Sequence, residues 1–96
     1  MKYAEPNPQT KIQFTQAELD YLAFQIGQAA HSQALLFRAI TAADEENKKK
    51  FRSGFPGEVD AVNAWRKGDL AKRMRLFGPT DCEAIQKILG RAKGNG

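Results

Sequence analysis

A long row of apolar side chains with helical spacing constrains the fold of this chain more than any other feature. The row runs from Leu19 to Ala43 in steps that alternate three and four residues. This spacing puts every member on one stripe of an α-helix, whereas a half-buried strand would alternate every second residue. The members of this apolar row, which has a single polar interruption at Gln33, are Leu19, Leu22, Ile26, Ala29, Gln33, Leu36, Ile40 and Ala43. The row therefore predicts one long helix over about 16–43.

Local signals mark the start of this helix and leave its end open. Thr15 and Glu18 have the T-x-x-E spacing of a capping box, in which the two residues satisfy each other's free backbone N–H groups. Beyond residue 43 two alternatives remain. Either the helix extends to residue 52, or it stops and a new one begins with a cap at Thr41 or Asp44.

The long helix is also the predicted site of self-association. A second row, formed by Ala23, Gly27, Ala30 and Ala34, carries small side chains that let another helix approach closely. Apolar residues on more than one side of a helix indicate that its own chain or a second copy covers it. We expect a homo-oligomer whose interface contains Leu19, Leu22, Ile26, Ala29, Gln33, Leu36 and Ile40.

Turn residues divide the rest of the chain into three or four shorter helices. Two glycines surround Pro56, which suits the first turn of a helix whose apolar stripe is Val59, Val62 and Trp65. That helix ends before Gly68. Asp69 is then expected to cap a short helix that carries Leu70 and Met74.

A second capping-box pair, Thr80 and Glu83, predicts a last helix with Ile85, Ile88 and Leu89 inside and an end near Gly90. No window alternates apolar and polar residues long enough to indicate a strand. The predicted fold is all-α, a single helical domain over 1–96 with flexible ends at 1–14 and 91–96.

Positive charge is concentrated in the last third of the chain. Residues 61–96 contain eight basic and three acidic residues, whereas residues 1–40 contain three of each. A basic surface attracts acidic proteins and nucleic acids alike. The predicted partner-binding residues are Trp65, Arg66, Lys67, Lys72, Arg73 and Arg75. Reversing the charges of Lys72 and Arg73 is expected to preserve folding and abolish partner binding.

Residues 68–90 have the outline of a helix-turn-helix, but the details disagree with DNA binding. The connection over 75–79 is apolar and longer than the usual three or four residues. Asp81 and Glu83 would bring negative charge to the end of the helix that must face phosphates. Trp65 is in register with Val59 and Val62, which favours a packing role over nucleobase stacking.

The usual catalytic and metal-binding patterns are missing from the sequence. His31 and Cys82 are the only histidine and cysteine, 51 positions apart, so a zinc site would lack ligands. Cys82 is expected to be a small buried hydrophobe, and one cysteine forms no disulfide within the chain. We expect no catalytic residue, no metal, no cofactor and no enzymatic activity.

The sequence predicts a soluble, cytoplasmic protein with no contact to membranes. Its first residues lack a continuous apolar signal segment, and no run of 18 apolar residues occurs. The leading functional hypothesis is protein–protein binding, as an adaptor, regulator or inhibitor, through the basic C-terminal third presented to an acidic protein surface. The alternatives are nucleic-acid binding by the same surface, or an oligomer that binds a small anionic ligand.

Overall fold

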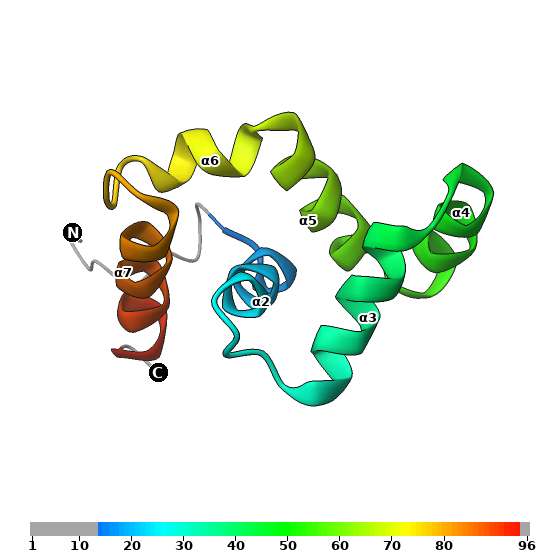
Figure 1. The fold of residues 1–96 in the computed structure, drawn as a ribbon, viewed down its shortest axis with the longest axis horizontal. Helices are drawn as coiled ribbons and strands as arrows, with labels where there is room; N and C mark the ends of the chain where they lie inside the picture. Colours follow the sequence, from blue (N-terminus) through cyan, green and yellow to red (C-terminus); the bar gives the residue numbers. More distant parts are fainter. Residues whose placement is uncertain (1–13, 95–96) are drawn as a thin grey trace, which may run out of the picture.

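Six helices and no strands make up the part of the chain that a computed structural model describes, residues 14–94. The helix α2 lies in the middle of the arrangement, and α3, α5, α6 and α7 surround it, as seen in Figure 1. The six helices are α2 (Gln16–Gln25), α3 (His31–Ala42), α4 (Glu45–Gly54), α5 (Pro56–Lys67), α6 (Asp69–Met74) and α7 (Asp81–Gly94). The all-α prediction is confirmed.

The expected long helix is wrong, because the chain breaks between α2 and α3. Ile26 ends α2, and Gly27 follows with φ of +75° in the left-handed region. The N–H of Gln28 donates to the carbonyl of Ala23 at 2.8 Å, and that of Gly27 to Phe24 at 3.1 Å. These two bonds form a Schellman motif, which satisfies the last carbonyls of a helix. Gly27 thus terminates a helix where the sequence pattern gave it a packing role.

The open question near residue 43 is answered by a second break. Ala43 has an extended backbone (ψ of 143°), and the carboxylate of Asp44 accepts a hydrogen bond from the N–H of Asn47 at 2.9 Å. This is the N-cap of a new helix, α4. The alternative in which one helix extends to residue 52 is therefore wrong.

The remaining boundaries follow the predicted turn residues with two differences. Pro56 begins α5 and Gly68, with φ of +87°, ends it, as expected. Asp69 does not cap α6; Gly68 holds the cap position and Asp69 is the first helical residue. The last helix does not end near Gly90 but continues to Gly94.

The core lies where α2, α3, α5, α6 and α7 meet. Its buried apolar residues are Phe14, Leu19, Tyr21, Leu22, Phe37, Ile40, Val59, Ala61, Val62, Leu70, Met74, Ala84, Ile85 and Ile88. In contrast, α4 contributes no buried residue and projects at one end of the molecule (Figure 1). None of the described helices is long and apolar enough to cross a membrane.

Most residues of the predicted flexible ends, 1–13 and 95–96, lie outside the part of the chain that the structure describes. Phe14, the last residue of the expected N-terminal arm, is 1% exposed and packs against the ring of Phe77 at a centroid distance of 5.9 Å. At the other end, residues 91–94 belong to α7. The fold therefore includes residues that composition alone assigns to the ends.

Candidate functional site

Residues predicted for partner binding lie on α5, α6 and the turn after α6, but most of their charged groups contact this chain. Arg66, in the last turn of α5, donates a hydrogen bond to the backbone carbonyl of Thr41 at 2.6 Å. Arg75 pairs with the carboxylate of Asp81 at the start of α7. The positive charge counted from the sequence is thus partly neutralised within the molecule.

Arg73 is the basic residue most deeply involved in the fold. Its Nη1 and Nη2 atoms donate to Oε1 and Oε2 of Glu18 at 3.0 and 2.8 Å, a bidentate pair that joins α6 to α2. The guanidinium carbon also lies 5.3 Å from the ring centroid of Phe14. Arg73 is therefore a structural residue, and its place among the predicted partner-binding residues is not supported by this geometry.

The Glu18 carboxylate has two functions at the same time. Burial by itself would raise the pKa of this group. Hydrogen bonds from Arg73 and from the backbone N–H of Thr15, together with the charge of Arg73, outweigh burial and lower the pKa of Glu18. The bond from Thr15 N–H, at 2.9 Å, completes the predicted capping box, in which the Glu18 N–H donates to Thr15 Oγ1 at 3.1 Å.

Lys67 and Lys72 remain as cations directed to solvent. Both are exposed, and neither makes an ion pair or side-chain hydrogen bond with residues 14–94. Four positions after Lys72 the turn carries Leu76, whose side chain is the most exposed large apolar group of the described chain, at 74%. We call Lys72, Arg75 and Leu76 the α6 surface. The sequence does not single out Leu76. Composition and charge counts do not concern one apolar residue, and helical periodicity does not predict which side of a turn residue is exposed.

Trp65 packs inside the molecule on one side and borders a cleft on the other. Its ring meets that of Tyr21 edge-on, at 5.8 Å between centroids and an angle of 72°. Tyr21 in turn contacts Phe24 and Phe37, so Trp65 extends an aromatic cluster. This confirms the packing role that its register with Val59 and Val62 predicts.

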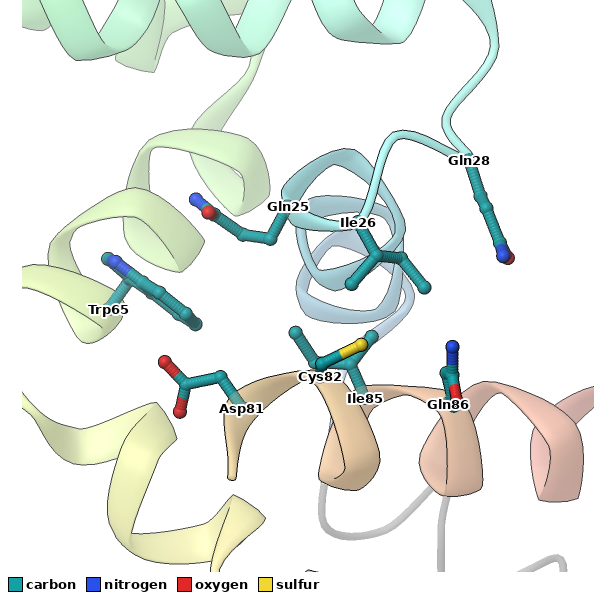
Figure 2. Close-up of a pocket in the computed structure, with 8 residues that line it drawn as sticks. All are labelled: Gln25, Ile26, Gln28, Trp65, Asp81, Cys82, Ile85 and Gln86. Atoms are coloured by element: carbon teal, nitrogen blue, oxygen red, sulfur yellow. The ribbon is translucent and has the colours of Figure 1, made fainter. Parts of the chain in front are cut away.

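The cleft beside Trp65 separates the end of α2 from the start of α7 and has a volume of ≈ 430 Å³. Side chains from both helices point into it in Figure 2, with Ile26 above and Cys82 below. Its lining consists of Gln25, Ile26, Gln28, Trp65, Asp81, Cys82, Ile85 and Gln86. Because no Lys or Arg lines the cleft, it does not suit a phosphate or another anion.

Cys82 is exposed at the edge of this cleft, so the expectation that it is buried is wrong. The neighbours Ala84 and Ile85 are buried in the core instead, and Cys82 points into the open cleft between α7 and the end of α2 (Figure 2). His31 begins α3 and is exposed. In the described chain, no group of three or more His, Cys, Asp or Glu side chains is arranged to hold a metal ion.

The predicted oligomer interface does not exist as one continuous stripe, because its members are divided between α2, the connecting loop and α3. Leu19, Leu22 and Ile40 are buried in the core of this chain and face its own helices. Ile26, Leu36 and Gln33 are partly buried, as is Ala29 in the loop. Self-association through the whole row would require unfolding of this core.

Comparisons with protein-family models, with curated proteins and with solved structures find no match to this chain.

Proposed function

We propose that this protein acts by binding another protein, as an adaptor, regulator or inhibitor, and not by catalysis. The α6 surface would make the contact. The observation that carries this proposal is Leu76, a leucine that is 74% exposed and directly adjacent to Arg75. When a partner covers an apolar side chain, the free energy falls by roughly 25 cal/mol for each Å² of apolar surface removed from water.

The charges around Leu76 indicate the chemistry of the partner. Lys72 has no ion-pair partner among residues 14–94, and Arg75 is exposed although it pairs with Asp81. An acidic protein surface with a protruding apolar side chain complements this arrangement, because opposite charges orient the partner and speed its association.

Nucleic acid is less well matched to the same surface. Affinity for DNA or RNA grows with the number of cations that contact phosphates. Arg66 and Arg73 donate to acceptors of this chain, so they are not free to do so without breaking those bonds. Trp65 is packed against Tyr21, which leaves less of its ring for base stacking.

The proposal is tested by selecting ligands from a displayed library of random peptides. We expect the selected peptides to be acidic and to contain an aliphatic or aromatic residue. Their affinity, measured by calorimetry, should fall at least about tenfold in a variant with Lys72→Glu and Leu76→Ser, since both a charged contact and an apolar anchor are lost.

Arg38→Glu is the matched control, because Arg38 is exposed on α3 and this change alters the net charge as Lys72→Glu does. It should leave peptide binding within a factor of about two, as expected for a distant charge screened by salt. Equal affinity of the selected peptides for the Lys72/Leu76 variant would refute the proposal. Micromolar, steeply salt-dependent binding of labelled DNA or RNA, with no peptide selected, would assign the surface to nucleic acid instead.

A further inference from the structure

The cleft beside Trp65 adjoins the α6 surface, because one ion pair belongs to both. Arg75 of the α6 surface pairs with the carboxylate of Asp81, and Asp81 lines the cleft. Arg75 also donates to the backbone carbonyl of Gly78, at 3.4 Å, in the turn that joins α6 to α7. A partner that contacts Arg75 therefore lies beside the cleft.

The polar part of the cleft consists of three side-chain amides. Gln25, Gln28 and Gln86 are exposed, and their side chains make no hydrogen bond to the residues that the structure describes. In Figure 2, Gln28 and Gln86 point toward each other from opposite walls, and Gln25 extends toward Trp65. Each amide offers N–H donors and a carbonyl acceptor, the same groups that a peptide backbone presents. These amides therefore complement the main chain of a peptide.

The rest of the lining favours an uncharged, apolar side chain. Ile26, Ile85 and Trp65 supply apolar surface, and the volume of ≈ 430 Å³ is within the range of about 300–1,000 Å³ that is usual for ligand pockets. No lysine or arginine lines the cleft, and its single carboxylate, that of Asp81, is already paired with Arg75. An acidic side chain would find no cation here, and a basic one would find no free carboxylate.

We infer that the cleft holds an uncharged segment of the same partner peptide whose acidic part contacts the α6 surface. An apolar side chain of this segment packs between Ile26 and Trp65, while the glutamine amides pair with its backbone. This inference rests on the proposed function, which supplies the partner. It adds the order of the partner's chemistry, with a negatively charged stretch followed directly by a neutral stretch that carries a second apolar anchor.

The test blocks the cleft through Cys82, the only cysteine of the chain, which is exposed and lines the cleft. The probe is the tightest-binding peptide selected on the wild-type protein from a cysteine-free displayed library. Alkylation of Cys82 with N-ethylmaleimide should weaken its binding, measured by calorimetry, at least about tenfold, because the reagent fills the place of the second anchor. Peptide at about ten times its Kd should in turn slow the alkylation at least about fivefold, because only the free protein reacts.

Two variants control for the modification itself. Cys82→Ser leaves the cleft open and should bind the peptide within a factor of about two of wild type, with or without the reagent. Cys82→Ser combined with Lys87→Cys moves the thiol to an exposed position of α7 outside the cleft lining. Alkylation there should change the affinity by less than a factor of about two. Equal weakening of both alkylated proteins would contradict the inference, since the effect would not depend on the cleft.

The results distinguish a failure of this inference from a failure of the proposed function. Suppose that the peptide loses affinity in the Lys72/Leu76 variant, but that alkylation of Cys82 neither weakens its binding nor is slowed by it. The α6 surface then binds the partner without the cleft, which overturns this inference alone. A peptide that binds the Lys72/Leu76 variant as tightly as wild type overturns both.

Discussion

The ion pair between Glu18 and Arg73 joins residues that are 55 positions apart in the chain. It connects the first turn of α2 to α6 and places the cation beside the ring of Phe14. The side chain of Glu18 is only 11% exposed, so water screens the contact poorly. Arg73, which the sequence predicts to bind a partner, therefore helps to hold α6 against α2.

Charge reversal at Arg73 should consequently destabilise the protein, contrary to the expectation from sequence. Arg73→Glu places two carboxylates together, and we expect a loss of about 3 kcal/mol in the free energy of unfolding, with about 2 kcal/mol for Glu18→Gln. Urea denaturation measures both. Arg75→Met breaks an exposed pair with Asp81 and should cost under about 1 kcal/mol. Equal losses of unfolding free energy in Arg73→Glu and Arg75→Met would show that the pair with Glu18 stabilises the fold no more than an exposed ion pair does.

The same carboxyl group makes stability depend on pH. Since the pKa of Glu18 is lowered in the folded state from its ordinary value of 4.5, the folded protein keeps this group charged to lower pH than the unfolded chain does. The resulting stabilisation is complete above the unfolded pKa and disappears as pH falls through the folded pKa. The difference in unfolding free energy between wild type and Glu18→Gln should therefore be constant at pH 6–7, and shrink below about pH 4.5. A difference that stays constant down to pH 2 would exclude this linkage.

At the scale of helices, a single glycine decides whether the apolar row forms one helix or two. The alternation of three and four residues continues across Gly27 without a change, so periodicity by itself predicts a continuous helix. Gly27 instead adopts a left-handed conformation that costs other residues about 1 kcal/mol. The signal for the break was present in the sequence as a glycine, but a helical interior tolerates one glycine as well.

Alanine substitutions distinguish one continuous helix from two helices that are separated at Gly27, because the sign of the stability change differs. Gly27→Ala should destabilise the protein by about 1 kcal/mol, because a Cβ is strained at φ of +75° even though nothing lies within 4 Å of it. Gly90→Ala, within α7 and equally open, should stabilise it by about 0.5–1 kcal/mol through helix propensity. Thermal unfolding followed by circular dichroism measures both. A stabilising Gly27→Ala would instead support the continuous helix.

For the whole molecule, the break in the helix changes which residues form the core. The apolar row includes Leu36 and omits Phe37, yet Phe37 is fully buried against Tyr21, at 5.0 Å between ring centroids, whereas Leu36 lines a surface groove beside Ser32 and Phe55. Restarting the helix at His31 turns α3 about its axis relative to α2. The phase of the first helix therefore does not carry over to the second.

Truncating Leu36 and Phe37 in turn should show that Phe37, and not Leu36, is the core residue. Phe37→Ala should lower the free energy of unfolding by about 3–5 kcal/mol, because it leaves a cavity in the core. Leu36→Ala should cost only about 1 kcal/mol, although a core position in the apolar row would cost about 2–5 kcal/mol. Urea denaturation of the two variants decides the matter, and a larger loss in Leu36→Ala would restore the original row as the core.

The sequence by itself determined the helical class, the cap formed by Thr15 and Glu18, and the turns at Pro56 and Gly68. These features depend on contacts within a few residues, where side-chain type and spacing suffice. Only the tertiary structure decided that Arg73 is held by Glu18, that Leu36 lines a surface groove, and that Leu76 is an exposed apolar group beside α6. Each of these depends on which helices meet across the core, and periodicity within one helix does not encode that pairing.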